Sequence, residues 1–485
     1  MIDPKTARRV SQSAILIAGL LGALFLIQTT AKQGLFGFFS TLLAILPVAW
    51  IIFAGSRWWI LMPLAVMFGG IFVLEYKIFT HEIALPLCLL ALLPMIATRR
   101  LGVHRRAFLP SASLLLLLLL TGNALASLYV ARLGGTGGTG SILRIYYHGL
   151  WAVIFTLAFY RFGESRHLKR LLILIYCLGV LRVLVSIVTY FLGRYIYVPY
   201  LNYVLGGMAQ GLLDLRFTGV QLAILSFACS LWVSSKWAKG FHAAVGLTSV
   251  VLVVMSAGRV SVAMVCAVPV IWALVRRKFG WLSVIGGILL ITALTLNQAP
   301  DILYRLPEEA RRALSILVRE SSTRWVDQHE LVQASNEWHL RLMELGLERW
   351  TESPWTFLFG NHVEAYDKGY ESLSATMEVR AQVAARMGLY ESGLWTVLAV
   401  AGGLGLVLYL RLFFFLLRDP WREIHQHGVQ DLAHVFSLWA IVNFFLWACF
   451  AWIAGGYPSF ELMMAAIAKA AYEDRKEPSP APQPT

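Results

Sequence analysis

About ninety mostly polar residues, from Asn297 to about Gly388, interrupt a sequence that is otherwise a succession of apolar segments. Most of these segments approach the roughly 20 residues that a helix needs to cross a bilayer. Hydrophobic residues make up 58% of the chain and charged residues only 14%, and many of the 17 tryptophans lie near the ends of apolar segments. This profile is typical of bilayer proteins and excludes a soluble domain of this length. We therefore predict an all-α, polytopic membrane helix bundle.

The apolar segments predict about 12–14 transmembrane helices. The expected spans lie near residues 13–30, 35–55, 58–76, 82–98, 108–131, 144–160, 171–193, 217–235, 241–257, 260–275, 281–297, 389–410 and 433–455. A shorter apolar stretch, Phe460–Ala471, returns the chain across the membrane. Residues 1–297 thus hold eleven helices, 298–388 form one large loop, 389–472 hold the C-terminal helices, and 473–485 form a disordered tail.

Basic residues in the short loops predict the orientation of the chain. Lys5, Arg8 and Arg9 precede the first span, which lacks a small-residue cleavage site, so we expect a retained helix with a cytoplasmic amino end. Later basic clusters follow an even number of spans: Arg57, Arg99–Arg106, Arg161–Arg170, Lys236–Lys239, Arg276–Lys278 and Arg411–Arg422. The positive-inside rule then places both termini in the cytoplasm and the 298–388 loop outside a cytoplasmic (inner) membrane.

The large extracytoplasmic loop is expected to be partly helical. Pro307–Val318 alternates apolar and charged positions at helical spacing, and Asn336–Trp350 carries apolar residues at helical spacing, with Pro354 soon after it as a stop signal. A third helical stretch, Ser374–Met387, leads into the next span. The loop is therefore predicted to be a folded element.

The composition also argues against other kinds of site. The net charge of +14 resides largely in the clusters between spans, so it indicates membrane topology and no nucleic-acid partner. The five cysteines lie within apolar spans without paired spacing, which supports neither a disulfide framework nor a thiolate metal site. His329, His339 and His362 lack the spacing of metal ligands, so no metal is expected.

Three residues are expected at the extracytoplasmic ends of spans: Arg216, Arg259 and Glu391. An arginine in such a place can simply extend to the lipid headgroups. Arg259 is different, because only a few residues, Ser256–Arg259, separate its two spans. Its guanidinium is thereby held near the apolar boundary, where it is expected to face a cavity or an anion.

Four segments of the chain resemble the O-antigen ligase and O-antigen polymerase superfamily, whose members move glycans from undecaprenyl pyrophosphate. Leu215–Gly219 resembles the Arg-x-x-Gly start of a span, and Ser256–Arg259 resembles a Ser-Arg-Gly hairpin. Arg341, followed by Trp350, Pro354 and Gly360, resembles the family's loop pattern. The segment 391–405 is similar to the span that begins His-Asn and ends Gly-x-x-Gly.

Glu391 replaces the histidine of that last pattern, which favours polymerase-like members of the family. The resemblance implies transfer of a glycan from undecaprenyl pyrophosphate, either to extend a polysaccharide or to ligate O-antigen. The expected partners are the undecaprenyl-pyrophosphate-linked oligosaccharide, a glycan or lipid acceptor and membrane lipids, with polysaccharide export or chain-length proteins as further candidates. The donor is already activated, so no cofactor is expected.

The residues fit this chemistry physically. A pyrophosphate leaving group needs fixed positive charge, and a guanidinium binds phosphate oxygens with two parallel hydrogen bonds. Arg216, Arg259 and Arg341 are the expected pyrophosphate ligands, with Arg259 also counted as catalytic. Glu391 is the expected catalytic base, since a carboxylate in a partly dry cleft can accept the proton of the attacking hydroxyl. Alternatively, Glu391 pairs with an arginine such as Arg386 and orients its span.

Two other functions stay open. A transporter or flippase of lipid-linked saccharide would also place arginines in a cavity, and Arg182 is the clearest mid-span charge. Transporters commonly carry inverted repeats and midplane charges, however, whereas here no repeat is evident and the polar residues gather at one face. A non-catalytic scaffold of an envelope polysaccharide complex is the third possibility.

Overall fold

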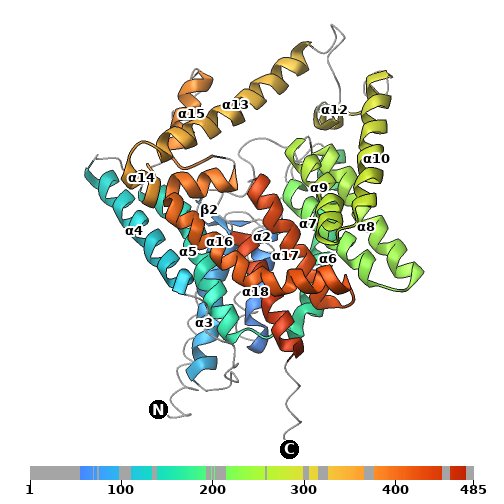
Figure 1. The fold of residues 1–485 in the computed structure, drawn as a ribbon, viewed down its shortest axis with the longest axis horizontal. Helices are drawn as coiled ribbons and strands as arrows, with labels where there is room; N and C mark the ends of the chain where they lie inside the picture. Colours follow the sequence, from blue (N-terminus) through green and yellow to red (C-terminus); the bar gives the residue numbers. More distant parts are fainter. Residues whose placement is uncertain are drawn as a thin grey trace, which may run out of the picture. The chain divides into compact units, whose positions relative to one another are not determined.

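The computed structural model describes residues 55–68, 70–73, 76–97, 111–133, 139–192, 198, 201, 215–256, 259–298, 305–314, 326–364, 376–390, 392–450 and 459–476. These residues fold into helices and one small antiparallel hairpin (Figure 1). Within the described residues, six segments are long and apolar enough to cross a membrane: Ser111–Leu133, Ser165–Leu192, Lys236–Met255, Phe279–Gln298, Gly393–His427 and Leu432–Cys449. The predicted helical, multi-pass fold class is confirmed. The expected spans near 13–30 and 35–55 lie outside the described residues, apart from Gly55.

The chain forms two compact units, which are interleaved in sequence. The first comprises residues 1–105 and 162–218, and the second comprises residues 106–161 and 219–485. The first unit contains short helices η1 (Gly55–Ile60), α2 (Leu61–Met67) and η2 (Ser165–His167), strands β1 (Gly70–Val73) and β2 (Tyr76–Phe79), and the longer helices α3 (Thr80–Ala97) and α6 (Leu168–Leu192). The boundary between the units falls within α7 (Arg216–Trp232).

The span expected near 58–76 is wrong as a single helix. α2 ends at Met67 because Phe68 adopts an extended conformation, and the chain then forms the hairpin of β1 and β2, in which Gly70 pairs with Phe79 and Val73 with Tyr76. Two consecutive glycines at positions 69 and 70 and the charges at positions 75 and 77 explain the break. Each glycine lowers helix stability by about 1 kcal/mol relative to alanine. A prediction of spans from apolar content does not take this helix-breaking effect into account.

The second unit contains most of the predicted spans and the loop helices. Its longer helices outside the 298–388 segment are α4 (Ser111–Leu133), α5 (Thr139–Phe162), α7, α8 (Lys236–Met255), α9 (Arg259–Val275), α10 (Phe279–Gln298), α16 (Gly393–His427), α17 (Leu432–Cys449) and α18 (Ser459–Lys476). The 298–388 segment contributes α12 (Glu308–Leu314), α13 (Val326–Trp350), α14 (Pro354–Phe359) and α15 (Met377–Arg386). The predicted partly helical segment between spans is therefore present in the structure. α18 extends past the predicted start of the tail at residue 473, to Lys476.

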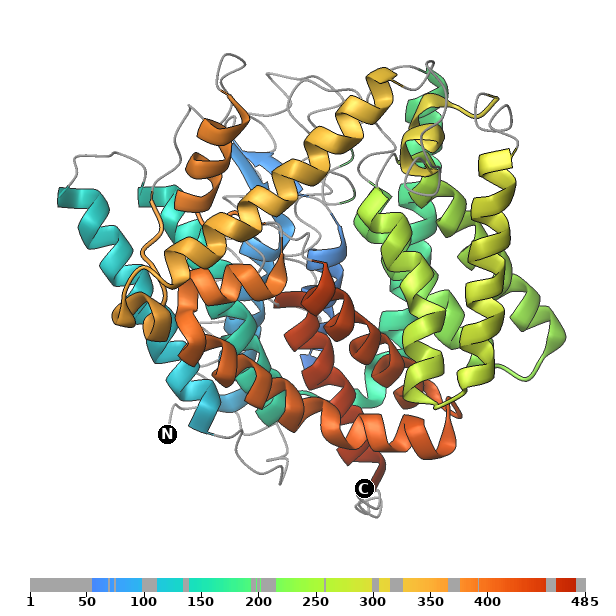
Figure 2. The same ribbon diagram turned by 45° about the horizontal axis from the view of Figure 1, so that its top comes forward.

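The core of the second unit is formed by α16, α17 and α18, which pack against one another. α4 packs on α16, and the buried side chains of this core include Trp439, Tyr409, Phe413 and Phe436. α13 lies across the helices, packing on both α15 and α16 (Figure 2). The apolar side chains of α10, in contrast, are largely exposed, as expected of a helix that faces lipid.

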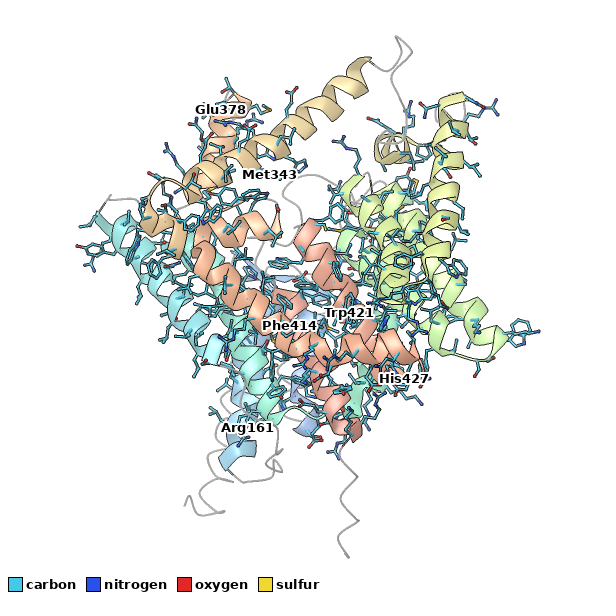
Figure 3. The ribbon with its side chains drawn as sticks, viewed as in Figure 1. Arg161, Met343, Glu378, Phe414, Trp421 and His427 are labelled. Carbon is cyan, nitrogen blue, oxygen red and sulfur yellow. The ribbon has the colours of Figure 1, made fainter. Side chains whose placement is uncertain are left out.

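The second unit has two ends, which we call the loop end and the tail end. Arg276, directly after α9, donates to the carbonyls of Ile424 and His425 at the C-terminal end of α16, at 2.7 and 2.6 Å. This is the tail end, which also holds the C-terminal end of α5, since the Tyr160 hydroxyl donates to Glu473 of α18. The loop end carries the N-terminal ends of α9 and α16 together with α13, α14 and α15. Figure 3 shows Met343 and Glu378 at the loop end and Arg161 and His427 at the tail end.

Candidate functional site

Arg216 and Arg259 each open a helix. Arg216 is the first residue of α7, Arg259 is the first residue of α9, and both are partly buried. Gly219 completes the Arg-x-x-Gly segment, and a Cβ atom there would lie only 2.7 Å from Cγ2 of Val253 in α8. Glycine at this position therefore has a steric reason, which is the close approach of α7 and α8. The phosphate-binding role of the two arginines stays a prediction.

Arg182, the mid-span arginine, holds the broken α2 helix in the first unit. Its side chain is fully buried and donates to the hydroxyl of Thr218 and, at 2.8 Å, to the carbonyl of Met67. The Thr218 hydroxyl donates to the same carbonyl at 3.0 Å. Met67 is the last residue of α2, so its carbonyl has no hydrogen-bond donor from a following helical turn. The Arg182 and Thr218 side chains supply donors to this carbonyl instead. These contacts give Arg182 a structural role.

Arg341 lies on α13 and is surrounded by carboxylates. Its guanidinium donates to both oxygens of Glu378 on α15, each at 2.8 Å, and to Glu344 and Glu348 on its own helix, each at 3.1 Å. The hydrogen bonds from Arg341 lower the pKa of Glu378 to about 2, so this carboxylate is ionised at neutral pH. A phosphate would have to displace these partners to bind Arg341. The pyrophosphate role of Arg341 stays a prediction.

Glu391 lies outside the described residues, whereas Tyr390 before it packs against α13. Gly346 of α13 packs against Tyr390 and Trp395, with a Cβ position 3.2 Å from Cδ1 of the tyrosine and 3.8 Å from Cβ of the tryptophan. Tyr390 is buried and donates its hydroxyl to the carbonyl of Ala385 at the end of α15, at 3.0 Å. The start of α16 therefore packs against the C-terminal part of α13.

Arg349 is a site residue that the sequence did not single out. It lies on α13, and its Nη2 donates to the carbonyl of His362 at 3.3 Å, while the Tyr390 hydroxyl accepts from the same side chain. The cation is also close enough to Tyr146 of α5 to act on it electrostatically. Among the described residues, no carboxylate pairs with Arg349, and its Nη1 is buried without a hydrogen-bond partner. Arg349 thus leaves positive charge uncompensated within this part of the chain.

The α16 helix is broken at the loop end, where the chain after α14 packs against it. Gly402 has φ +70° and ψ −177°, which interrupts the helix, and a Cβ at that residue would lie 2.3 Å from the carbonyl oxygen of Leu358. Gly360, with φ +85°, fits as closely against the backbone of Val400. Both glycines are required, because an L side chain at positive φ is strained and would also collide with the facing backbone.

The freed carbonyls at this break find side-chain and backbone donors. The Asn123 side chain of α4 donates to the carbonyl of Val400 at 2.9 Å, and the backbone N–H of Asn361 donates to that of Ala399 at 2.7 Å. Ser127 of α4 accepts from the N–H of Val363 and bonds to the Tyr146 hydroxyl at 3.1 Å. The loop end is therefore a fixed assembly of α4, α5, α13 and α16.

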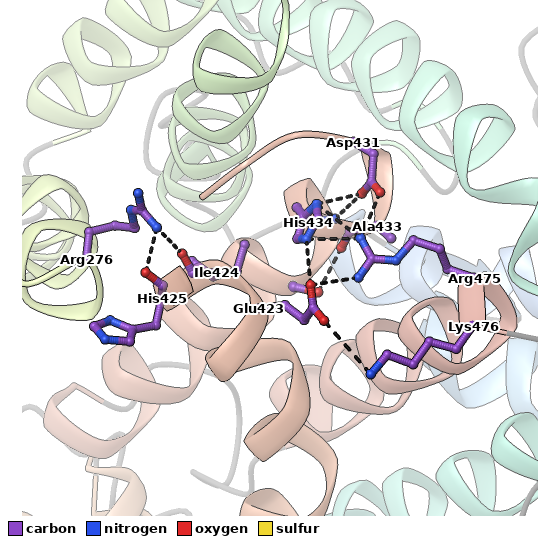
Figure 4. A network of polar contacts seen from close by, with 10 residues as sticks. Arg276, Glu423, Ile424, His425, Asp431, Ala433, His434, Arg475 and Lys476 are labelled. Atoms are coloured by element: carbon purple, nitrogen blue, oxygen red, sulfur yellow. Dashed lines mark hydrogen bonds and ion pairs between the residues drawn. The ribbon is translucent and has the colours of Figure 1, made fainter. Parts of the chain in front are cut away.

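The tail end has a different electrostatic character. Arg475 of α18 pairs with Asp431 at 2.9 Å and with Glu423 at 3.0 Å, and His434 lies within the same network (Figure 4). Burial alone would raise the pKa of Asp431, but hydrogen bonds from His434 and Arg475 outweigh it and hold the pKa below its usual range. Nearby, Lys469 pairs with Asp419 and with Glu473. Arg475 and Lys469 are therefore paired with carboxylates, whereas Arg276, also at the tail end, binds backbone carbonyls.

No family model, no curated protein and no solved structure matches this chain. The resemblance to O-antigen ligases and polymerases accordingly stays a prediction from the motifs. The structure adds that two of the resembling segments, around Arg341–Gly360 and 391–405, contact each other through Gly346, Gly360 and Gly402.

Proposed function

We propose that this chain is a glycosyltransferase that moves a glycan from undecaprenyl pyrophosphate to a sugar acceptor at the loop end of its second unit. The observation that carries the proposal is the packing of α13 on the start of the α16 span, where an arginine without a described carboxylate partner meets two tyrosines. The reaction either polymerises polysaccharide repeat units or ligates a finished O-antigen. The loop end would face the extracytoplasmic side of the cytoplasmic membrane, as the basic clusters indicate.

Arg349 is the residue we assign to the pyrophosphate, with Arg259 as a second candidate. When the glycosidic bond to the pyrophosphate breaks, negative charge grows on the leaving phosphate, and a fixed guanidinium in a water-poor setting stabilises it. Arg349 is held by the His362 carbonyl and the Tyr390 hydroxyl, and its Nη1 has no hydrogen-bond partner among the described residues. Arg341 is already neutralised by three glutamates, so it contributes less to this role.

Glu391 remains the proposed base. Glu391 directly follows Tyr390 in the sequence, and the Tyr390 hydroxyl accepts a hydrogen bond from Arg349. A carboxylate there would take the proton of the attacking sugar hydroxyl as the new bond forms. Neither this step nor the release of the pyrophosphate requires a cofactor, because the donor is already activated.

A transporter or flippase is the second candidate function, and it would use charges in mid-membrane. Arg182 is the strongest such charge, but its contacts with Met67 and Thr218 explain it as a structural residue. The charge arrangement therefore favours a reaction at the loop end. A non-catalytic scaffold would need neither an uncompensated Arg349 nor a carboxylate at position 391.

The proposal is tested with purified protein in liposomes that contain a polyprenyl-pyrophosphate oligosaccharide. A polymerase lengthens the lipid-linked glycan in steps of one repeat, a ligase transfers it to an added acceptor, and a flippase leaves its length unchanged while moving it across the bilayer. We expect chain extension or transfer that is lost in Glu391→Gln, because general-base assistance contributes about 10²–10⁴-fold. Unchanged donor length with movement across the membrane would reject the transferase.

A further inference from the structure

The short segment around α14 lies beside the middle of a membrane span. Nδ2 of Asn123 donates to the carbonyls of Phe359 and Val400, at 2.7 and 2.9 Å. Asn123 lies ten residues before the end of α4, which is about 15 Å along the helix axis. Val400 lies seven residues into α16, or about 10 Å from its start. Because the hydrocarbon core of a bilayer is about 30 Å thick, these contacts fall well within the length of both spans.

Backbone N–H and C=O groups at both ends of α14 have hydrogen-bond partners, which backbone inside a membrane requires. Ser353 and Thr356 form a capping box at the start of α14, with the Ser353 Oγ accepting from the Thr356 N–H at 3.1 Å and the Thr356 hydroxyl accepting from the Ser353 N–H at 2.9 Å. Pro354 removes one further donor at the first helical position. At the other end, Asn123 binds the Phe359 carbonyl and the Trp350 indole binds that of Phe357, at 2.9 Å. Irregular backbone is tolerated at membrane depth only with such partners.

The outward side chains of α14 are apolar. Trp355 is 68% exposed, Leu358 48% and Phe357 45%, although each is large and hydrophobic. The Trp355 ring contacts Phe359 at 4.3 Å between centroids, and Phe357 stacks on Trp350 at 4.7 Å. A soluble loop would not leave three such side chains in water on one short helix.

The apolar surface continues onto neighbouring elements of the second unit. α4 and α16, which hold α14 in place, carry exposed apolar side chains of their own, including Leu118 and Val407. Lipid acyl chains are the partner that best fits the exposed apolar side chains of α14, because α4 and α16, which hold α14 in place, also expose apolar side chains to lipid.

We propose that residues 354–360 form a re-entrant membrane segment, which enters one leaflet of the bilayer, docks into the break of α16 and exposes Trp355, Phe357 and Leu358 to lipid acyl chains. The charged residues just before it, Glu348, Arg349 and Glu352, mark the side from which the chain enters. The 298–388 segment is thus not a purely aqueous loop. This inference rests on the membrane-spanning helices alone and is independent of the proposed transferase activity.

Spin labels in lipid nanodiscs test the inference on a variant that lacks the five native cysteines. Labels are attached at Trp355→Cys and Leu358→Cys, with Leu118→Cys as the lipid-facing control and Glu344→Cys as the aqueous control, since all four positions are exposed. Collision with oxygen, which concentrates in lipid, is compared with collision with a water-soluble nickel chelate. We expect positions 355 and 358 to match Leu118→Cys, with a several-fold excess of oxygen over nickel collisions.

Two results would overturn the inference. Nickel access at positions 355 and 358 equal to that of Glu344→Cys would place α14 in water. Low access to both reagents, with label–label broadening that disappears on dilution with unlabelled protein, would show that a second copy of the chain covers the face. If the cysteine variants fail to fold, a carbene-generating hydrophobic photoprobe dissolved in the bilayer is used on the unmodified chain. We then expect the photoprobe to label residues within 355–358. If the probe labels α4 but no residue within 355–358, the proposal is rejected.

Discussion

Two arginines at opposite ends of the second unit, Arg475 and Arg349, have different kinds of partner. At the tail end, Arg475 is enclosed by Asp431 and Glu423, and Lys469 pairs with Asp419 and Glu473. At the loop end, Arg349 contacts a backbone carbonyl and tyrosines, and no carboxylate of the described residues balances its charge. A half-buried guanidinium that lacks a carboxylate partner among the described residues is expected where an anion arrives during function.

The same contrast occurs within a single helix. Arg341 and Arg349 lie eight residues apart on α13, yet only Arg341 is enclosed by glutamates. Arg341 and Arg349 share a residue type and a helix and differ in their partners. These partners make Arg341 a structural residue and Arg349 the candidate ligand of the lipid-linked donor. The predictions below test this contrast, starting with the change that should disturb the loop end most.

Replacing Gly402 by alanine should have the largest effect. The residue has φ +70°, and the added Cβ would meet the Leu358 carbonyl oxygen at 2.3 Å, so strain and collision act together. The left-handed conformation alone costs roughly 1–2 kcal/mol for an L residue. We expect little folded protein by size-exclusion chromatography in detergent. Gly287→Ala in α10, where a Cβ meets nothing within 4 Å, is the control, and equal folded yield from both variants would contradict the account of the break.

Arg349→Gln should lower transfer strongly while the protein stays folded. Removing one donor to a developing oxyanion typically costs about 10²–10³-fold in rate, and we expect a loss of that order in kcat/KM with the lipid-linked donor. Arg349→Lys should also be impaired, because it loses the planar fork. Arg341→Gln is the matched control, with a smaller expected loss. A near-normal rate for Arg349→Gln beside a severe loss for Arg341→Gln would reverse the assignment of the two arginines.

Glu378→Gln should loosen α15 from α13 without a comparable loss of transfer. In the wild type the pKa of Glu378 is lowered to about 2 by Arg341, so its contribution is present above the ordinary glutamate pKa and is lost only as the pH falls toward 2. The distance between spin labels at Leu340→Cys and Met377→Cys should therefore stay constant from neutral pH to about pH 4. Broadening of that distance near pH 5 in the wild type would show that the ion pair does not hold α15.

Asp431→Asn should have the smallest effect. Asparagine keeps the helix cap of α17 but loses the ion pair with Arg475, and partly exposed pairs contribute about 0–1 kcal/mol. The pKa of Asp431 is lowered on folding, so its contribution is present at neutral pH and declines as the pH falls below about 4. Thermal melts of both proteins should differ slightly at pH 7 and converge in acid. A difference that grows on acidification would contradict the direction of the shift.

The sequence predicted well those features that depend on local pattern. The expected loop helix Asn336–Trp350 lies within α13, and Ser374–Met387 closely matches α15, because helical periodicity and the Pro354 stop are local signals. The spans from 82–98 onward correspond to helices for the same reason. The span near 58–76 failed because hydropathy does not register the glycine pair that precedes the hairpin.

The candidate site depended on contacts between distant parts of the chain, which no local pattern encodes. Glu344 and Glu348 lie near Arg341 in the sequence, but the two-oxygen contact with Glu378, 37 residues after Arg341, depends on the packing of α15 on α13. The break at Gly402 likewise follows from the approach of Leu358 and Gly360 to its backbone. A Gly-x-x-Gly pattern indicates that the backbone is unusual there, but it does not identify the segment that packs against it.

The most direct test of the account asks which side of the membrane each end of the second unit faces. His362, whose carbonyl binds Arg349, is exposed at the loop end, and His427 is exposed at the tail end. A charged maleimide that does not cross the cytoplasmic membrane is applied to cells expressing His362→Cys or His427→Cys on a background without native cysteines. The account predicts labelling of position 362 in intact cells and of position 427 only after the membrane is opened. Labelling of position 427 in intact cells, with position 362 protected, would contradict it.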